Sequence, residues 1–334
     1  MNVAVIGLGY WGPNLLRNIY ETQMCDQIFC CDLQEKNLKK VKNRYPSVQT
    51  EMDYTKLLKR DDIQAVVIAT PVSTHFPLGL ESLTAGKHVF IEKPFTCTHQ
   101  EAQKLIKLAT EKNLILMVGH TFEYSPPVIK IKNIIENGEL GEIYYLSASR
   151  VNLGLHQKDV SVIWDLAPHD FSILFYWLDE EPKRVSAMGK DYVQKNIPDV
   201  AFINLEFPSG CVAHVQVSWL APSKLRRTTV IGSNKMLVYD DTENIEKIKI
   251  YDKGVEYKDP ETFGEYHLSY RTGDVVSPYL ETFEPLNMEM RHFIDCCLNH
   301  KTPKTDGFSG LRVVKALEAA EESLRNNSAV MEIK

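Results

Sequence analysis

Three glycines near the start of the chain have the spacing of a phosphate-binding turn. An apolar run at 2–6 leads directly into Gly7-Leu8-Gly9-Tyr10-Trp11-Gly12, after which a helix is expected to begin. In such a turn the first glycine permits the tight bend, the second lets the backbone approach a pyrophosphate, and the third allows close packing of helix on strand. The start of the helix adds N–H donors and the positive end of its dipole. The motif therefore indicates a dinucleotide site.

An acidic side chain follows at the distance that this motif requires. Asp32 ends the second apolar run, 20 residues after Gly12. A carboxylate there accepts hydrogen bonds from the adenosine ribose and repels a 2′-phosphate, which favours NAD. Lys36, Lys39 and Lys40 lie on the helix expected next, so NADP remains the less favoured alternative.

A lysine stands at the end of another apolar run. The run at 88–91 is followed by Glu92-Lys93-Pro94. Ligands bind outside the carboxyl ends of parallel strands, so this loop is expected to border the same crevice as the glycine turn. The Lys93 ammonium could orient a substrate oxygen beside the nicotinamide, or a desolvated lysine could take a proton. The alternative is a surface lysine before a turn proline.

An aspartate and a histidine further along have helical spacing. Asp165 and His169 are four residues apart, which places both side chains on one helix face, where the carboxylate can orient the imidazole. Histidine is a suitable general base near neutral pH. Taken alone, this pattern is more often structural. Pro168 is unfavourable inside a helix, so the helix is expected to begin nearer to that residue.

The elements that must position these residues change in kind along the chain. Up to about residue 120, apolar runs of strand length alternate with helical segments, which is typical of a parallel sheet covered on both faces. Strands are expected at 2–6, 27–31, 65–69, 88–91 and 114–118, and helices near 12–22, 34–45, 73–85 and 98–112. Thr98 and Glu101 have the spacing of a capping box. The fold class is α/β, with an N-terminal Rossmann dinucleotide-binding domain at 1–120.

The remainder, 121–334, is predicted to be an α+β domain that binds substrate and mediates oligomerisation. Short turns separate its apolar runs, which indicates a large, mostly antiparallel, open-faced sheet. Strands are expected at 143–152, 184–189, 201–207, 211–218, 228–231 and 236–239, and helices near 160–178, 284–299 and 309–326. The C-terminal helix could pack back on the first domain.

Composition agrees with two globular domains. The 334 residues are 44% hydrophobic and 25% charged, with net charge −6, which excludes disordered, collagen-like and coiled-coil chains. An acidic balance argues against nucleic acid or an anionic membrane as partner. Neither a signal peptide nor a membrane-spanning run is visible, and seven cysteines without CxxC spacing suggest reduced thiols, so a cytoplasmic protein is expected. With no histidine in an HExxH pattern, no metal is expected.

Several of these segments together resemble the glucose-fructose oxidoreductase, inositol dehydrogenase and rhizopine catabolism family, Gfo/Idh/MocA. The resemblance rests on the glycine turn, on Ala69-Thr70-Pro71 with His75, and on Glu92-Lys93-Pro94. It implies that Lys93, Asp165 and His169 are the catalytic residues. The cofactor-binding residues that it implies are Gly7, Gly9, Tyr10, Trp11, Gly12, Asp32, Thr70, Pro71, His75, Glu92 and Lys93.

Two segments depart from the family pattern. Val160-Ser161-Val162 replaces the glycines that commonly precede the aspartate, and Gly119 to Tyr124 replaces a segment that often contains arginine. That second segment lines the cleft in the family. His120 and Tyr124 are therefore candidates for cofactor or sugar contacts, and ordinary loop packing is the alternative for both.

The segment from Arg150 to Asp170, followed by Ser218-Trp219-Leu220, is similar to a subgroup that acts on nucleotide-activated sugars. Its members oxidise the sugar 3-position of substrates such as UDP-N-acetylglucosamine and its uronic acid. Substrate contacts are expected from His120, Tyr124, Arg150, Asp165 and His169. Arg150, Lys224, Arg226 and Arg227 could also bind a diphosphate, although a residue of this kind is more often a surface residue or a partner of a nearby acid.

The expected reaction is hydride transfer from a sugar carbinol carbon to the nicotinamide, with His169 as base and Lys93 at the oxygen. One alternative is a dehydrogenase or ketoreductase of a free sugar or inositol. Another is a catalytically silent dinucleotide-binding regulator. A homodimer or homotetramer is expected, because the free face of the large sheet needs to be covered.

Overall fold

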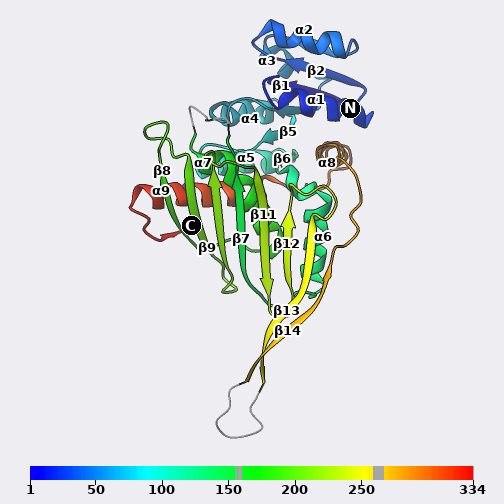
Figure 1. Cartoon of the computed structure of the whole chain (residues 1–334). Coiled ribbons are helices and arrows are strands. Elements are labelled where there is room, and N and C mark those ends of the chain that lie inside the picture. The colour runs from blue at the N-terminus through cyan, green and yellow to red at the C-terminus, as the bar shows by residue number, and fades with distance from the viewer. Residues whose placement is uncertain (155, 157–159, 259–266, 334) are drawn as a thin grey trace. The chain divides into compact units, whose positions relative to one another are not determined.

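The chain folds into two compact units, seen here in a computed structural model (Figure 1). The structure describes residues 1–154, 156, 160–258 and 267–333. The first unit comprises residues 1–125 and 283–315, and the second comprises 126–282 and 316–334. None of the described helices combines the length and apolar character needed to cross a bilayer.

A six-stranded parallel sheet forms the centre of the first unit. Its strand order is β3-β2-β1-β4-β5-β6, so the order reverses between β1 and β4. In open sheets of this kind, ligands bind at the carboxyl ends of the strands on either side of such a reversal. The strands are β1 (Asn2–Ile6), β2 (Gln27–Cys31), β3 (Gln49–Glu51), β4 (Ala65–Ile68), β5 (His88–Glu92) and β6 (Leu116–Gly119). The predicted Rossmann fold is confirmed. The sequence misses β3 because this short edge strand is polar and carries no apolar run.

Helices cover both faces of this sheet. They are α1 (Gly12–Thr22), α2 (Glu35–Arg44), α3 (Tyr54–Leu58), α4 (His75–Thr84), α5 (His99–Glu111) and α8 (Pro285–Asn299), with two 3₁₀ turns, η1 (Val72–Thr74) and η2 (Thr121–Tyr124). The capping box of α5 is present, because the Thr98 hydroxyl accepts a hydrogen bond from Glu101 N–H and the Glu101 carboxylate accepts one from Cys97 N–H.

Helix α8 belongs to the first unit, although all residues after 120 were predicted to belong to the second domain. One face of α8 carries Leu286, Met290, Phe293 and Ile294, all buried in the same core as α1 and β5. The Phe293 ring packs edge-on against Phe90, with ring centroids 5.7 Å apart. Burial of this apolar stripe, rather than position in the sequence, determines where the segment packs.

The second unit is built on a nine-stranded sheet. Its order is β14-β13-β12-β11-β7-β10-β9-β8-β15, and among its described pairs only β7 with β10 is parallel. The strands are β7 (Ile143–Val151), β8 (Arg184–Lys190), β9 (Val200–Glu206), β10 (Val212–Ser218), β11 (Leu225–Gly232), β12 (Met236–Asp240), β13 (Ile248–Lys258), β14 (His267–Val276) and β15 (Met331–Glu332). The predicted, mostly antiparallel sheet is therefore confirmed.

Four elements of the second unit were not predicted. Charged residues interrupt the apolar pattern of β13 and β14, β15 is only two residues long, and α6 (Pro126–Glu136) begins with two prolines that resemble a turn. Both prolines are in the first turn of α6, where a proline costs little because the N–H of such a position has no partner inside the helix.

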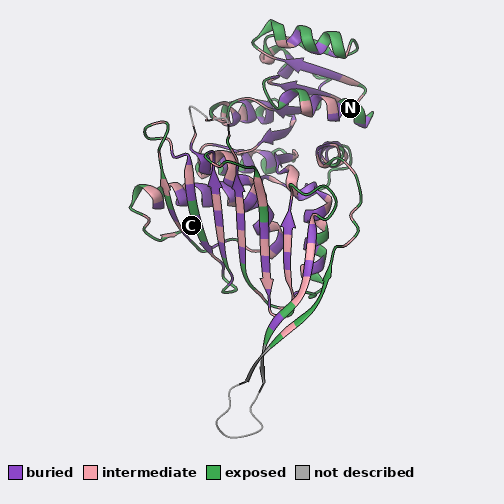
Figure 2. Ribbon diagram, in the orientation of Figure 1, coloured by how far each residue is buried: buried purple, intermediate pink, exposed green. Residues whose placement is uncertain are grey.

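Helix α7 (Val162–Leu178) covers one face of this sheet, together with the end of α9 (Gly307–Arg325). Along β9, buried Ala201, Ile203 and Leu205 alternate with outward-facing side chains such as the exposed Phe202 (Figure 2). This alternation is that of a sheet covered on one face.

Helix α7 begins six residues before Pro168, so the expectation of a start nearer to that proline is wrong. Val162 and Ile163, in its first turn, are fully buried, and Val162 N–H donates to the carbonyl of Pro198. Burial of the first turn compensates for the backbone hydrogen bond that Pro168 cannot make.

Candidate active site

The glycine turn has the geometry that its spacing predicts. Gly7 has φ +93°, and a β-carbon there would lie 2.5 Å from the carbonyl oxygen of Ala69. A β-carbon on Gly12 would lie 1.9 Å from the carbonyl oxygen of Gly7. Apart from Gly9 itself and its two neighbours in the chain, no atom of the described residues lies within 4 Å of a β-carbon built on Gly9. The first and third glycines thus serve packing, and the second faces open space that a pyrophosphate can approach.

The start of α1 is suited to an anion. Trp11 is its N-cap and makes no side-chain capping hydrogen bond, so the first turn of the helix is not closed by the protein's own side chain. Tyr10 and Trp11 are both exposed beside the turn. The residues predicted to hold the pyrophosphate are therefore accessible.

Asp32 ties the end of β2 to the glycine turn. Its Oδ2 accepts a hydrogen bond of 2.7 Å from Leu8 N–H, and its Oδ1 accepts from Gln34 N–H at 2.7 Å and from the Asn37 amide at 3.2 Å. A carboxylate can accept about four hydrogen bonds, so capacity remains for a ribose hydroxyl. The same side chain shapes the turn and offers an acceptor at its edge.

The loops after β4 and β5 are joined through a buried histidine. His75 Nδ1 lies 2.9 Å from the carbonyl oxygen of Pro94, and its Nε2 lies 2.9 Å from that of Thr70. Burial is the main cause that lowers the pKa of His75, so the ring is neutral at pH 7. Although a cofactor contact was predicted for His75, the ring is enclosed by protein. Its position is that of a support for Thr70, Pro71 and the loop of Lys93.

Lys93 directly follows β5 and is half-buried. Its backbone N–H donates to Oε2 of Glu92 at 3.1 Å, and the peptide bond to Pro94 is cis. The Glu92 carboxyl is buried, which raises its pKa, while the nearby Lys93 ammonium and Trp11 indole lower it. The loop of Lys93 and the glycine turn therefore both act on this carboxyl.

The 3₁₀ turn after β6 is packed into the first unit. His120 is buried, and neither ring nitrogen has a hydrogen-bond partner among the described residues. The Tyr124 ring is buried and its hydroxyl lies 3.2 Å from Thr305 Oγ1. Both side chains therefore pack inside the first unit, as the loop-packing alternative expects, and a cofactor or sugar contact stays a prediction.

In the second unit, Asp165 and His169 share one face of α7 and are both half-buried. Oδ2 of Asp165 accepts a hydrogen bond of 3.0 Å from the indole Nε1 of Trp219, which follows β10. The His156 ring packs against Trp219, and Gly154 N–H donates to the Trp219 carbonyl. The loop after β7 and the end of β10 thus hold the aspartate in place.

The arginines expected to bind a diphosphate are paired with aspartates. Arg150 is buried and donates from Nε and Nη2 to Asp170 at 2.7 and 3.1 Å. Arg226 lies 3.3 Å from Asp241, and Arg227 lies 2.8 Å from Asp240. Lys224 is exposed. The geometry argues for a structural role for Arg150, whose donors face an acid of α7.

Sequence reasoning gave no role to two residues of the site. Trp219 positions Asp165, and it was named only within Ser218-Trp219-Leu220, the segment similar to the nucleotide-sugar subgroup. Glu289 is fully buried on α8 and accepts a 2.6 Å hydrogen bond from Thr121 Oγ1. It occupies a core position between Leu286 and Met290 on the apolar face of its helix, which is an unusual place for an acid.

Two family models match the chain. Residues 1–120 match the oxidoreductase family with an NAD-binding Rossmann fold, and residues 128–238 match the GFO/IDH/MocA C-terminal domain.

Three relatives illustrate the similarity. The chain is 28% identical over 256 residues to UDP-N-acetylglucosamine 3-dehydrogenase of Acidithiobacillus ferrooxidans, covering 76% of this chain and 77% of the relative. It is 25% identical to scyllo-inositol 2-dehydrogenase (NAD⁺) of Bacillus subtilis, covering 98% and 95% of the two chains. A solved structure of the Acidithiobacillus ferrooxidans enzyme superposes with a TM-score of 0.79 at 26% identity, covering 97% and 99%.

Proposed function

The chain belongs to the GFO/IDH/MocA family of NAD-binding oxidoreductases, and from that premise we propose that its substrate is a UDP-sugar oxidised at C3. UDP-N-acetylglucosamine and its uronic acid are the proposed substrates. The observation that carries this proposal is the similarity, over nearly the whole chain, to a UDP-N-acetylglucosamine 3-dehydrogenase.

The residues of the first unit fit a dinucleotide. Gly9 leaves the turn open, the start of α1 faces the pyrophosphate position, and Asp32 retains acceptor capacity for the ribose. NAD supplies the hydride acceptor when it is bound. The protein's part is to bind it, orient it and exclude the 2′-phosphate.

Three side chains are proposed to act at the reacting hydroxyl. His169 accepts its proton as general base, and Asp165 orients the imidazole and stabilises the imidazolium. The Lys93 ammonium orients the oxygen and stabilises its developing negative charge. The Trp219 indole, which donates to Asp165, supports the proposal because an oriented carboxylate is what an orienting residue requires.

Lys224 is proposed as the contact to the diphosphate, because Arg150, Arg226 and Arg227 are engaged by aspartates. Replacement by alanine should raise KM for a UDP-sugar while leaving the Kd for NAD unchanged. Lys235→Ala removes another lysine of the second unit, and its KM should stay at the wild-type value. An unchanged KM in Lys224→Ala would remove this residue from the substrate site.

The second candidate function is oxidation of a free inositol or sugar. It is favoured by the similarity to scyllo-inositol 2-dehydrogenase, which covers 98% of this chain. Screening NADH absorbance with UDP-N-acetylglucosamine, its uronic acid, glucose and myo-inositol separates the two. Turnover of myo-inositol without turnover of either UDP-sugar would overturn the first proposal.

Lys93→Ala tests whether the protein is an enzyme at this site or a silent regulator. The variant should lose turnover while still binding NADH with fluorescence enhancement. Turnover at the wild-type rate would contradict the role given to Lys93, and loss of both properties would point to misfolding, which circular dichroism detects.

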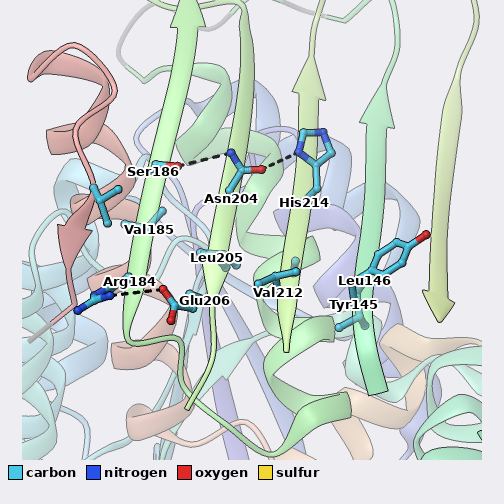
Figure 3. A pocket seen from close by; sticks show the side chains of 12 residues that line it. Tyr145, Leu146, Arg184, Val185, Ser186, Asn204, Leu205, Glu206, Val212 and His214 are labelled. Carbon is cyan, nitrogen blue, oxygen red and sulfur yellow. Dashed lines mark hydrogen bonds and ion pairs between the residues drawn. The ribbon is translucent and has the colours of Figure 1, made fainter. Parts of the chain in front are cut away.

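A second copy of the chain is proposed to cover the outer face of the nine-stranded sheet. A hollow of about 270 Å³ lies on this sheet. Figure 3 shows the side chains that line it, among which Asn204 connects His214 with Ser186 by hydrogen bonds. Exposed apolar side chains on the sheet strands include Tyr145, Met188, Phe202 and Val212. Arg184 and Glu206 give this face both a positive and a negative side chain. An interface between two identical copies requires such a combination, because each copy presents the same surface to the other.

Light scattering at micromolar concentration tests this assembly. Phe202→Glu should convert the oligomer to a monomer, whereas Tyr279→Glu, which changes an exposed tyrosine outside the sheet strands, should not. A monomeric wild-type protein would contradict the proposal.

The seven cysteines support a reducing, cytoplasmic setting, which is also part of this proposal. All seven are free thiols, and five of them are buried. Burial raises the pKa of the Cys25 thiol and of the Cys211 thiol to about 11, so both thiols are protonated and unreactive at neutral pH. Fractionation of the producing cell with an antibody to the protein tests the location.

A further inference from the structure

Two glutamates of the first unit meet next to the loop of Lys93. Glu92 ends β5 and Glu289 comes from α8, 197 positions away in the sequence, and both are buried. Each has one carboxyl oxygen, Oε1, without a hydrogen-bond partner among the described residues. A buried carboxyl with an oxygen that accepts no hydrogen bond is costly to keep charged, which favours its protonated form.

The surroundings fix both carboxyls. Glu92 Oε2 accepts from Lys93 N–H, and a β-carbon on Gly119 of the adjacent strand would lie 3.1 Å from that oxygen. Glu289 Oε2 accepts from the Thr121 hydroxyl at 2.6 Å. Gly119 thus leaves the space that Glu92 fills, and the turn after β6 holds Glu289.

Glu92 lies at the edge of the sheet where the nicotinamide half of a dinucleotide is expected to bind, so its carboxyl can interact with the ring charge. Strands β4, β5 and β6 form the half of the sheet that binds the nicotinamide half of a dinucleotide, at its carboxyl edge. The indole of Trp11 in the glycine turn is near enough to Glu92 to lower the pKa of its carboxyl. The nicotinamide ring is cationic in NAD⁺ and neutral in NADH, so a titrating carboxyl at this edge distinguishes the two.

Burial and mutual repulsion favour at most one negative charge on the carboxyls of Glu92 and Glu289 together. Burial raises the pKa of Glu92 to about 7, against the opposing effects of the Lys93 ammonium, its N–H and the Trp11 indole. Burial, then the charge of Glu92, holds the pKa of Glu289 well above its usual range, and Glu123 adds to this. Glu289 is therefore neutral when Glu92 titrates.

Other charged groups pack around the pair. Burial raises the pKa of Glu123 to about 8, while Lys304 and Arg312 lower it and Asp306 raises it. Burial lowers the pKa of His120 to about 3, so that ring stays neutral near pH 7. Glu92 differs from these described neighbours in that the Trp11 indole of the glycine turn also acts on its carboxyl.

We propose that Glu92, with Glu289 as its neutral partner, is a proton-linked positioning group that gives NAD⁺ and NADH different affinities according to pH. Binding of the cationic ring favours the carboxylate, so NAD⁺ binding releases a proton from Glu92 and NADH binding does not. By linkage, NAD⁺ affinity rises relative to NADH affinity as pH rises through the titration of Glu92. The inference rests on NAD binding by the family and is independent of the proposed sugar.

Calorimetric binding of NAD⁺ and NADH to the whole protein, from pH 5.5 to 8.5 and in two buffers of different ionisation enthalpy, tests it. The wild type should release protons with NAD⁺ only, and the ratio Kd(NADH)/Kd(NAD⁺) should rise about tenfold for each unit by which NAD⁺ shifts the pKa. The ratio cancels titrations that affect the adenosine and diphosphate contacts equally. No substrate is involved, so the result does not depend on the sugar assignment.

The matched variants are Glu92→Gln and Glu289→Gln, the same change at the two members of the pair. Glu92→Gln should make the Kd ratio independent of pH, whereas Glu289→Gln should keep the pH dependence. Persistence of the pH dependence in Glu92→Gln, its loss in Glu289→Gln, or equal proton release with both cofactors would each overturn the proposal.

A second variant guards against misfolding of Glu92→Gln. Gly119→Ala crowds the same carboxyl without removing it, and should shift the midpoint of the Kd ratio while the circular dichroism spectrum stays unchanged. A midpoint identical to the wild type would count against Glu92 as the titrating group.

Discussion

The indole Nε1 of Trp219 donates a 3.0 Å hydrogen bond to Oδ2 of Asp165, connecting the end of β10 to the first turns of α7. Both residues belong to the second unit. Because a carboxylate on a helix surface can rotate, this contact gives Asp165 one orientation. It is the observation in the structure that best separates an orienting aspartate from an ordinary surface acid.

Trp219→Phe should therefore reduce activity more than stability. A hydrogen bond to a charged group contributes about 1.5–3 kcal/mol, which corresponds to a fall in kcat of roughly tenfold to a hundredfold. The Kd for NADH should not change. Steady-state kinetics and fluorescence titration measure the two quantities.

Trp177→Phe is the matched control for that variant. Trp177 lies at the other end of α7 and donates its indole hydrogen bond to the backbone carbonyl of Val128. Its replacement should lower the melting temperature with little effect on kcat. Equal losses of kcat in the two variants would show that Trp219 acts only through stability.

Gly9→Ala and Gly12→Ala should fail in different ways. A β-carbon on Gly12 collides with the Gly7 carbonyl oxygen at 1.9 Å, so this variant should lose about 1–3 kcal/mol of unfolding free energy. A β-carbon on Gly9 meets no described protein atom within 4 Å, so the melting temperature should stay near the wild-type value. Its Kd for NAD should rise about tenfold or more, because the methyl occupies the pyrophosphate approach.

Thermal melts and NADH titrations of both glycine variants provide the measurement. A wild-type Kd for NADH in Gly9→Ala would mean that the pyrophosphate does not bind next to this residue. The cofactor would then bind at another site.

Asp32→Ala should weaken NAD binding and reduce discrimination against NADP. The variant loses the acceptor for Leu8 N–H, which shapes the turn, and the charge that repels a 2′-phosphate. Loss of charged hydrogen bonds of about 1.5–3 kcal/mol predicts a Kd for NAD that is about 10 to 100 times higher. Fluorescence titration with NADH and NADPH gives both constants.

Asp53→Ala provides the comparison, since Asp53 is another aspartate of the first unit that follows a strand. Its carboxylate caps α3 by accepting from Thr55 N–H at 2.9 Å. The variant should lose about 1 kcal/mol of stability and keep the wild-type preference for NAD. A change of cofactor preference here would undermine the assignment of Asp32.

Arg150→Met should destabilise the second unit strongly. It leaves the carboxylate of Asp170, which is 4% exposed, without the guanidinium that pairs with it. Breaking a buried ion pair in this way costs about 3–5 kcal/mol. By contrast, Arg325 is 76% exposed, so Arg325→Met, which removes its ion pair with Glu321, should cost about 0–1 kcal/mol.

Urea unfolding of both arginine variants measures the difference. If Arg150→Met were as stable as Arg325→Met but had a much higher KM for a UDP-sugar, Arg150 would be a substrate ligand rather than a structural residue.

Local chemistry explains what could be predicted from the sequence. The glycine turn, Asp32 and the capping box of α5 depend on residues close together in the chain, so their spacing alone specifies them. The buried strands of the first unit are continuous apolar runs, so they could also be predicted from the sequence. The polar strand β3 and the short strand β15 lack such a signal.

Long-range packing decided the rest. The sequence by itself predicted the Rossmann domain, which is confirmed, and it proposed Asp32 as a ribose contact and Lys93, Asp165 and His169 as catalytic candidates. Only the tertiary structure could pair Arg150 with Asp170, place Trp219 on Asp165, and bring Glu289 from α8 to Glu92. The physical reason is that burial of the apolar face of α8 determines where Glu289 lies. No sequence pattern near Glu92 indicates which distant helix packs against it.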